Sequence, residues 1–478
     1  MLAILVAVFF IGVPTAQAVV GPANLEYGYE PISGVDNGRS SGDQGTSEVS
    51  DSGSSSISPV ETDTSSPGFF AIITGSEFLI LSLLLVTLTV GWLAWRRFSG
   101  RSDNSGMIPR LVALLAILVA LPLVAFSSSQ SAERSKAPKG FYGAITQEPF
   151  SATDSIRMAR GGIESLRIPL EWSGVQPDNR EEFNWDGLDS TIGLAARSGI
   201  SVLPFVYASP DWVTGRFTNL PVKNDTQRRD WKTFVRALVE RYGSRGVFWK
   251  KHGPATSDPI EARPIRNWQV WNEANFFYFA TPVSSKDYVT LLKMTSKTIK
   301  SVDPSAKIML SGLYGSPPKK QVKVGRGVAS YEFLRQIYAR GGKQFFDTAA
   351  VHPYAPDTAA MKGLLSRFRS VMAQNGDAGA PLSITEVGWG SGKGGFLDVG
   401  SEQAQARQVK SAYRYLLDKR HQLRLKSVYW FVWQDKDRSQ ESCNFCYTTG
   451  WFKAGEPGEG LKAKPSWRQF TKFSGGQP

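Results

Sequence analysis

The sequence contains only two cysteines, Cys443 and Cys446, in 478 residues. A chain with a single pair of cysteines is not held together by a disulfide framework. The pair is spaced Cys-x-x-Cys, and no second pair completes the four ligands of a structural zinc site. The two residues are therefore expected to form either a small loop disulfide or a redox pair, depending on the compartment in which they lie.

The sequence also lacks a nucleic-acid-binding motif, although its net charge is +13. The charge is uneven: residues 1–130 carry 5 basic and 10 acidic side chains, and residues 131–478 carry 50 and 32. A basic domain is attracted to anionic surfaces. Without such a motif, an anionic membrane face or an acidic polysaccharide is the expected partner, and nucleic acid is not. A surface that serves only solubility is the alternative.

Aromatic residues, by contrast, are abundant, with 14 Trp, 15 Tyr and 27 Phe. Flat apolar rings of this kind stack on sugar rings in carbohydrate-binding clefts. They also fill the core of a large barrel. For any single aromatic residue, the composition alone does not decide between sugar binding and core packing.

The first part of the chain reads as an export signal followed by a linker. Residues 1–18 form an apolar run that ends in Ala-Gln-Ala, the small-x-small pattern of a cleavage site, which predicts a signal peptide. Because the usual positively charged start is missing, an uncleaved anchor is the alternative. Residues 19–68 are rich in Ser and Gly and have no hydrophobic period, which predicts a disordered linker.

Two further apolar runs, residues 69–95 and 111–127, are predicted to be transmembrane helices, with buried core helices as the alternative. The loop between them, residues 96–110, carries four arginines and one acid. By the positive-inside rule this loop lies in the cytoplasm. The chain after the hairpin then lies on the outer side of the plasma membrane, beginning with a short linker at residues 128–138.

From residue 139 to residue 475, short apolar runs alternate with longer helical stretches such as Thr226–Tyr242, Ser285–Val302 and Glu402–Asp418, a pattern typical of βα units. Eight such runs predict a (β/α)8 TIM barrel. A doubly wound open sheet is the alternative, but no Gly-rich phosphate fingerprint follows the first strand. The predicted strands are Tyr142–Ile145, Ser165–Leu170, Ser201–Tyr207, Trp268–Trp271, Lys307–Ser311, Thr348–His352, Leu382–Thr385 and Ser427–Trp433.

Polar and aromatic residues gather where these strands end, which is where a barrel of this type places its functional groups. Asn272 and Glu273 end the fourth strand, and Glu386 ends the seventh. Two carboxylates that face each other across a barrel mouth are the layout that glycoside hydrolysis requires. A helix cap or a salt bridge is the alternative role for either glutamate. The other candidates at strand ends are Arg167, Trp172, Trp212, His352, Tyr354 and Trp433.

In this order the residues resemble clan A, the retaining glycoside hydrolases with a (β/α)8 barrel. Asn272-Glu273 matches the clan's Asn-Glu pair, whose Glu is the general acid/base, and Glu386 matches its nucleophile. Many members have Pro after the acid, where this sequence has Ala274. Further matches are Arg167 on strand two, His352-Pro353-Tyr354 on strand six, and Trp433, with Trp430 as its alternative, on strand eight.

Two stretches narrow the resemblance to family 39 and to bacterial exopolysaccharide-cleaving relatives. They are Trp172–Pro177, with the sequence WSGVQP, and Phe183–Asp189, with the sequence FNWDGLD. The resemblance covers roughly residues 139–475. It implies that Arg167, Asn272, His352, Tyr354 and the tryptophans contact a sugar, and that no cofactor or metal is needed.

The expected mechanism is double displacement. The apolar neighbours Trp268, Trp271 and Phe276 are expected to raise the pKa of Glu273, so that it donates a proton, while Arg167 and Tyr354 keep Glu386 ionised for attack. The expected separation of the two carboxyl groups is about 5–5.5 Å, the retaining distance.

Two other functions remain open from the sequence. A transglycosylase uses the same covalent intermediate with a sugar as the acceptor, and a non-catalytic glycan-binding or assembly protein would need neither glutamate. In the outward-facing topology, a disulfide is the favoured state of Cys443 and Cys446.

Overall fold

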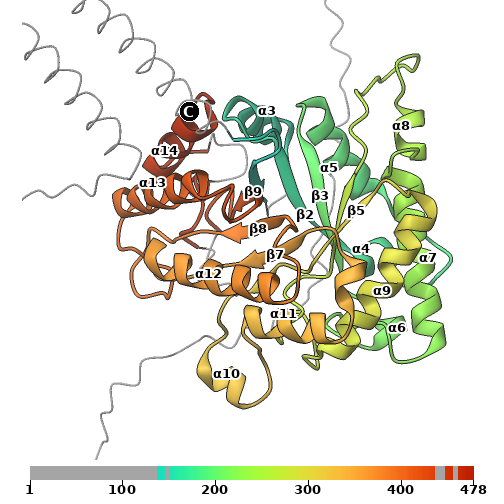
Figure 1. The fold of residues 1–478 in the computed structure, drawn as a ribbon. Coiled ribbons are helices and arrows are strands. Elements are labelled where there is room, and N and C mark those ends of the chain that lie inside the picture. Colours follow the sequence, from blue (N-terminus) through green and yellow to red (C-terminus); the bar gives the residue numbers. More distant parts are fainter. Residues whose placement is uncertain (1–136, 147–149, 437–446, 456–460) are drawn as a thin grey trace, which may run out of the picture. The chain divides into compact units, whose positions relative to one another are not determined.

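The computed structural model describes residues 137–146, 150–436, 447–455 and 461–478 (Figure 1). The predicted signal, linkers and transmembrane helices at residues 1–136 lie outside the described residues, and so do Cys443 and Cys446. Among the described residues, none of the helices combines the length and the apolar character that crossing a membrane requires.

The described chain folds around one curled sheet of nine parallel strands, in the order β5-β4-β3-β2-β1-β9-β8-β7-β6. This arrangement fits the predicted TIM barrel. The strands are β1 (Tyr142–Ile145), β2 (Ser165–Glu171), β3 (Ser201–Tyr207), β4 (Asn267–Val270), β5 (Lys307–Met309), β6 (Leu313–Tyr314), β7 (Ala349–His352), β8 (Leu382–Val387) and β9 (Leu425–Trp430).

The two ends of this sheet meet at the fifth predicted strand, which is broken into β5 and β6. Met309 at the end of β5 forms a parallel bridge to Thr348, just before β7, and β6 pairs directly with β7. The amide of Leu310 also donates to the carbonyl of Thr348 at 3.1 Å. Both halves of the broken strand therefore lie beside β7, and eight strand positions enclose the barrel.

Helices connect the strands and cover the outside of the sheet (Figure 1). They are α3 (Ala152–Arg160), α4 (Trp172–Val175), α5 (Asp186–Arg197), α6 (Asp211–Thr214), α7 (Asp225–Tyr242), α8 (Val247–Lys251), α9 (Ser285–Val302), α10 (Lys319–Lys323), α11 (Ser330–Ala339), the 3-10 helix η1 (Gly342–Phe345), α12 (Thr358–Gln374), α13 (Glu402–Asp418) and α14 (Pro465–Ser474).

Side-chain caps explain why several predicted helices begin where they do. Asn224 accepts a hydrogen bond from the amide of Gln227 at the start of α7, and Ser284 and Ser401 do the same for α9 and α13. Capping oxygens satisfy amide groups that have no partner inside the helix. The predicted helices Ser285–Val302 and Glu402–Asp418 are confirmed at both ends.

Several predicted strands end one to three residues away from the observed ends, and two of these differences lie next to the site. Strand β4 stops at Val270, because Trp271 takes a left-handed backbone conformation with φ 70°. The eighth predicted strand, Ser427–Trp433, is wrong at its carboxyl end, since β9 ends at Trp430. The alternation of apolar residues in the sequence does not show at which residue a strand stops pairing with its neighbours.

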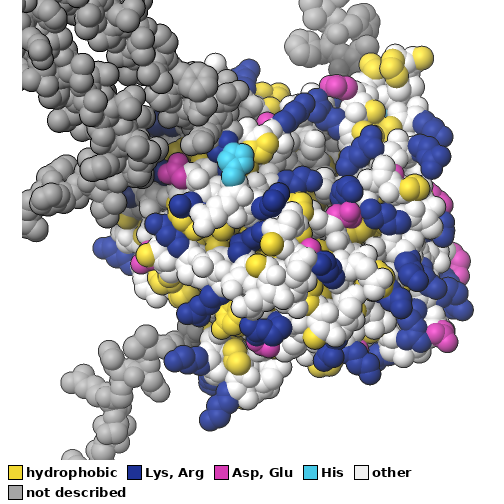
Figure 2. All heavy atoms as spheres, in the orientation of Figure 1, with side chains coloured by type: hydrophobic (Ala, Val, Ile, Leu, Met, Phe, Trp, Pro, Cys, Tyr) yellow, Lys and Arg dark blue, Asp and Glu magenta, His cyan; other side chains and the backbone are white. Residues whose placement is uncertain are grey.

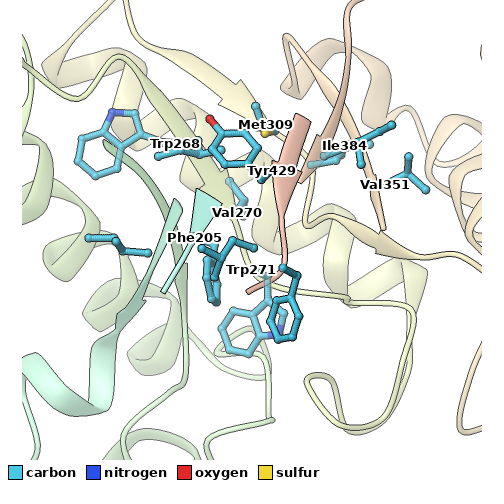
Figure 3. Packing of buried hydrophobic residues seen from close by; sticks show 14 of the residues in the cluster. Phe205, Trp268, Val270, Trp271, Met309, Val351, Ile384 and Tyr429 are labelled. Atoms are coloured by element: carbon cyan, nitrogen blue, oxygen red, sulfur yellow. The ribbon is translucent and has the colours of Figure 1, made fainter. Parts of the chain in front are cut away.

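The core is built from apolar side chains of the strands and of the inward faces of the helices. Phe205, Val270, Met309 and Ile384, on four different strands or strand ends, are buried together (Figure 3). Strand β1 has Gly143 where any side chain would collide, since an added Cβ would lie 2.2 Å from the ring of Tyr429. The tyrosine ring thereby fills the space beside β1.

Candidate active site

Seven polar side chains from four strands meet at the carboxyl-terminal side of the barrel. Strand β2 supplies Arg167, β4 and the turn after it supply Gln269, Asn272 and Glu273, and β7 and β8 with their flanks supply the rest. All seven are buried, with the two glutamates the most accessible at 5% and 7%. The seven residues, called the carboxylate cluster below, are Arg167, Gln269, Asn272, Glu273, His352, Tyr354 and Glu386.

Glu386 is held by two donors that favour its ionised form. Nη1 of Arg167 lies 2.7 Å from Oε1, and the hydroxyl of Tyr354 donates to Oε2 at 2.6 Å. Burial raises the pKa of Glu386 above its usual value, and the charge of Arg167 and the hydrogen bonds from Tyr354 and Arg167 oppose this rise. Because both oxygens are engaged by donors, Glu386 is the carboxyl group of the site whose ionised form is better stabilised.

Glu273 lies in a different environment, although it is close by. Its backbone has φ 38°, and its amide donates to the carbonyl of Ser311 at 2.8 Å, which fixes the turn after β4. Burial, and next the negative charge of Glu386, raise the pKa of Glu273 well above its usual value. The neutral acid is therefore the favoured form of Glu273.

A chain of hydrogen bonds explains how Glu273 is oriented. Nδ1 of His352 lies 2.6 Å from Oε1 of Glu273, and Nε2 lies 2.9 Å from the hydroxyl of Thr385. Gln269 donates to the same hydroxyl at 3.1 Å, and its own Oε1 accepts from Nε of Arg167 at 2.7 Å. Burial, followed by the charge of Arg167, lowers the pKa of His352 well below its usual value, so the ring is neutral.

One assignment of protons satisfies this whole chain. Gln269 donates to Thr385, the Thr385 hydroxyl donates to Nε2 of His352, and Nδ1–H of His352 donates to Oε1 of Glu273. The other oxygen of Glu273, Oε2, is then the one that carries the acid proton. Gln269 thereby links the arginine that holds Glu386 to the histidine that orients Glu273.

Asn272 completes the cluster. Its Oδ1 accepts a hydrogen bond from Nη2 of Arg167 at 2.6 Å. This contact fixes which end of the side-chain amide faces the arginine, and Nδ2 keeps no partner among the described residues. The amide nitrogen is available to a ligand hydroxyl.

The two glutamates and His352 are close enough to share a ligand. One side-chain atom from each of the three residues lies within 4.8 Å of the others. Such a group has the composition of a metal site, but the guanidinium of Arg167 already supplies a positive charge 2.7 Å from Glu386. A buried cation of the protein thus balances the carboxylate without a metal ion.

The predicted tryptophans do not behave alike. Trp172 is fully buried, stacks on Phe234 with ring centroids 5.3 Å apart, and donates its indole N–H to Gln176. Trp433 is also buried, and its indole N–H donates to Asp154 at 3.0 Å. Both rings are buried among protein side chains, and the predicted contact of these two residues with substrate stays a prediction.

Trp212 differs from them because it is partly exposed. It packs edge-on against Trp172, with ring centroids 5.8 Å apart, and donates its indole N–H to the carbonyl of Gln176 at 2.9 Å. One part of this ring remains accessible to a ligand, so its predicted contact with a sugar stays a prediction.

Several residues that contact or adjoin the cluster were not identified from the sequence. Phe431, directly after β9, lies with its ring 6.3 Å from that of Tyr354, so it takes the place predicted for Trp433. Thr385 precedes Glu386, and strict alternation would turn the two side chains to opposite faces. The pairing of β8 with β9 is irregular between Ile384 and Val387, where both residues turn toward the site.

A third carboxylate lies at the end of β2, next to the cluster in the register of the sheet. The hydroxyl of Tyr207 donates to Oε1 of Glu171 at 2.6 Å, and burial raises the pKa of Glu171. Glu171 and Arg167 are four residues apart on one strand, so both side chains point to the same face. Glu171 stands where the sequence places polar groups, at the end of the second predicted strand, although no role was assigned to it.

The sequence matches no family model and no curated protein. Its fold is nevertheless shared by solved structures. A family 39 glycoside hydrolase from Bacteroides cellulosilyticus aligns over 71% of this chain and 64% of its own, with 18% identity and a TM-score of 0.51. The chain therefore spans about two thirds of that protein.

Two other structures are similar to the same degree. GH5_18 from Bifidobacterium longum subsp. longum, solved in complex with Manb1-4GlcNAc, aligns over 70% of this chain and 78% of its own, with 14% identity and a TM-score of 0.51. A glucosidase from Croceicoccus marinus aligns over 70% and 67%, with 12% identity and a TM-score of 0.50. At these identities the similarity establishes a shared α/β barrel fold.

Proposed function

We propose that this protein is a retaining glycoside hydrolase, with Glu273 as the general acid/base and Glu386 as the nucleophile. The observation that carries the proposal is the different surroundings of two neighbouring carboxyl groups. Arg167 and Tyr354 donate to both oxygens of Glu386 and oppose the rise that burial causes in its pKa, whereas burial and the charge of Glu386 raise the pKa of Glu273 well above its usual value. One oxygen of each carboxyl group lies within 4.8 Å of one oxygen of the other, a close approach that favours direct attack over the wider spacing of an inverting enzyme.

The first step would break the glycosidic bond. The carboxylate of Glu386 attacks the anomeric carbon, and Glu273 gives its proton to the departing oxygen, so a glycosyl ester forms on Glu386. The Nδ2 group of Asn272 is placed to bond a hydroxyl of the sugar as positive charge develops on the ring. Trp212, which is partly exposed, is the aromatic residue available to line the sugar site.

The second step would return the enzyme to its starting state. Once Glu386 is esterified, it no longer carries the charge that raises the pKa of Glu273. Glu273, now ionised, accepts a proton from a water molecule as that water attacks the anomeric carbon. The ester bond breaks, Glu386 leaves as a carboxylate, and the sugar is released with its original anomeric configuration.

The comparisons support the proposal at the level of the fold, since structures named as a family 39 glycoside hydrolase and a glucosidase share it. The sequence supports a location as well. We propose that the spans predicted at residues 69–95 and 111–127 hold the domain at the outer face of the plasma membrane, where a polysaccharide would be its substrate.

The test is to trap the intermediate in the full-length protein. Glu273→Gln protein would be mixed with a panel of aryl glycosides, and the peptide that contains Glu386 would be weighed by mass spectrometry. A mass increase of one glycosyl unit on that peptide is the expected result, since deglycosylation needs the base. The parent protein should release a product of unchanged anomeric configuration, measured by proton NMR immediately after mixing.

The control is Glu386→Gln, which should form no adduct and release no sugar. Transfer of the glycosyl unit to added sugars in preference to water would identify a transglycosylase. Binding of a glycan with no turnover by the parent, across the panel, would contradict the proposal and indicate a binding protein.

A further inference from the structure

A second feature of the domain lies on its outer surface, between α7 and α9. The facing sides of these helices enclose a hollow of about 460 Å³, which continues into a second of about 350 Å³. Both volumes are in the range of ligand sites. The cationic side chains of this hollow, called the basic groove below, are Arg228, Lys232 and Arg236 from α7 and Lys293 and Lys297 from α9.

Helix periodicity explains why these cations form rows. Arg228, Lys232 and Arg236 follow one another at intervals of four residues, as do Lys293 and Lys297, so each row has about one cation per turn, about 6 Å apart along the axis. Figure 2 shows Lys and Arg side chains gathered over the part of the domain where Figure 1 draws α7 and α9.

Neighbouring acids neutralise only part of this charge. Asp225 pairs with Arg228 at 2.7 Å, and Glu240 approaches Arg236 at 4.0 Å. Within the described part of the chain, no carboxylate lies in ion-pair distance of Lys232, Lys293 or Lys297. Lys293 lies over the ring of Phe345 at 5.8 Å, and these three exposed ammonium groups have no negative partner within ion-pair distance. Their mutual repulsion would be relieved by an anionic ligand.

From this arrangement we infer that the basic groove binds an anionic polysaccharide, one that carries carboxylate or sulfate groups along its length. Hydroxyl groups of Thr290, Thr298 and Ser301 also line the groove, and they suit the hydroxyls of sugars. In a barrel of this type, helices begin near the catalytic face. Arg228, in the first turn of α7, is therefore the end of the groove nearest the carboxylate cluster.

Other anionic partners fit the groove less well. A membrane-binding surface presents protruding apolar side chains, and the large exposed hydrophobic residues of the described chain, such as Val247 and Phe396, lie elsewhere. Single-stranded nucleic acid is bound by aromatic side chains that stack on bases, and no lining residue is aromatic. A concave, polar, cationic groove suits a single hydrated polymer chain.

The inference rests on the proposed function only in treating the bound polymer as a substrate. Binding of the polymer to the groove can be tested without any catalytic activity. Full-length Glu386→Gln protein would be titrated with polygalacturonate, a carboxylated polysaccharide, and with dextran, a neutral one. Binding of the first alone, weakened by added salt, is expected. The double variant Lys293→Glu/Lys297→Glu in the same background should bind about tenfold more weakly or worse.

Helix α13 offers a matched control. Lys410 and Arg414 are exposed and four residues apart, so Lys410→Glu/Arg414→Glu makes the same change of charge on another helix. Equal loss of binding in the two double variants would overturn the inference, because the effect would then come from net charge. Equal binding of dextran and polygalacturonate would overturn it too.

The acidic residues 19–68 of the chain are the competing occupant. A synthetic peptide of that sequence would be titrated against the same variants. If Lys293→Glu/Lys297→Glu loses the peptide and keeps polygalacturonate, the groove holds the linker and the inference is wrong. Binding through the groove without hydrolysis of any glycan would instead remove the proposed function and leave the groove's assignment intact.

In the active parent protein, substitutions in the basic groove should change the kinetics on polymeric substrates only. The groove variant should raise the KM for an anionic polysaccharide and leave the kinetics on a small aryl glycoside unchanged, since Lys293 and Lys297 lie on the exposed outer side of α9 and the carboxylate cluster is buried. Equal changes on both substrates would show that the substitutions disturb the fold, and thermal unfolding of both double variants would check this directly.

Discussion

At the scale of the residue, the site depends on two identical side chains that behave differently. Glu273 and Glu386 are both buried, so burial alone raises the pKa of each. The difference comes from what touches them. Glu386 receives donors on both oxygens, whereas Oε1 of Glu273 faces a neutral histidine. Neighbouring donors, more than residue type, assign the two roles.

The leaving group should reveal the role of Glu273. In Glu273→Gln, turnover of substrates with a poorly acidic leaving group, such as alkyl glycosides, should fall by about 10²–10⁴-fold, because their oxygen needs a proton. Formation of the glycosyl ester from a nitrophenyl glycoside should fall much less. The measurement is the pre-steady-state burst of nitrophenol against the steady-state rate on an alkyl glycoside.

Glu386→Gln is the comparison for that experiment. It should lose both activities equally, since every substrate needs the nucleophile. If Glu273→Gln also lost both equally, the assignment of acid and nucleophile would be contradicted.

The pH dependence of activity should show the effect of Tyr354 on the pKa of Glu386. Activity requires Glu386 ionised and Glu273 protonated, so it should fall at low pH as Glu386 gains a proton and at high pH as Glu273 loses one. The hydrogen bond from Tyr354 lowers the pKa of Glu386. In Tyr354→Phe the acidic limb of kcat/KM should therefore move to higher pH.

Tyr314→Phe provides the matched control. Tyr314 is a partly buried tyrosine, its ring lies 6.2 Å from that of Tyr354, and no hydrogen bond joins it to Glu386. Its substitution should leave the acidic limb in place. An unshifted limb in Tyr354→Phe would mean that the observed titration belongs to another group.

At the scale of the element, the break between β5 and β6 makes room for the histidine. Gly312 lies in this break with φ 65°, and an added Cβ would lie 2.2 Å from Nε2 of His352. The carbonyl of Ser311, in the same break, accepts the amide of Glu273. A continuous fifth strand would displace both Glu273 and the histidine that orients it.

Gly312→Ala should therefore damage catalysis more than stability. The Cβ would push His352 away from Glu273, and a displacement of about 1 Å at a catalytic group can cost on the order of 100-fold in rate. The left-handed backbone should add a loss of about 1–2 kcal/mol in the free energy of unfolding. Both values are measurable, by steady-state kinetics and by chemical denaturation.

Gly475→Ala separates the two effects. Gly475 also has a left-handed backbone, with φ 74°, but an added Cβ there has no neighbour within 4 Å. This variant should lose a similar amount of stability and keep its kcat. A comparable loss of kcat in both variants would show that backbone strain, and not the contact with His352, causes the effect.

At the scale of the whole molecule, the charge of the chain and its predicted topology suggest one arrangement. The described domain belongs to the basic part of the chain, and the acidic residues precede the predicted spans. If the hairpin of residues 69–95 and 111–127 anchors the protein, the barrel follows the membrane by a linker of about a dozen residues.

This topology predicts the outcome of a protease experiment. In intact cells whose outer layers are permeable to protease, the barrel should be digested, and a tag inserted in the loop of residues 96–110 should be protected until the cells are lysed. After fractionation, both should sediment with membranes. A soluble barrel, or a tag that is cleaved in intact cells, would contradict the predicted orientation.

Sequence patterns predicted most of the elements for physical reasons that are local. Helix α9 has a serine cap at its start and an apolar face along its length, and both features are visible as residue spacing. The strands of the barrel are short apolar runs bounded by turns. Glu273 and Glu386 were identifiable because polar groups directly after a buried strand are rare unless a site needs them.

The residues that the sequence did not identify depend on contacts between distant segments. Trp433 and Phe431 are both aromatic and close in the chain, and only the early end of β9 turns one toward Tyr354 and the other into the core beside Trp467. Thr385 could be placed in the site only once the irregular pairing of β8 with β9 was known. Gln269 could be placed there only once its contacts with Arg167 and Thr385 were known.

By itself, the sequence determined the order of strands and helices, the two carboxylates at strand ends and the excess of positive charge, because each of these is written in composition or in spacing along the chain. Only the tertiary structure decided which glutamate is ionised, which aromatic ring adjoins it, and that five cations of α7 and α9 share one groove. Protonation and binding depend on distances of a few ångströms between residues that are far apart in the chain, and those distances exist only once the barrel has closed.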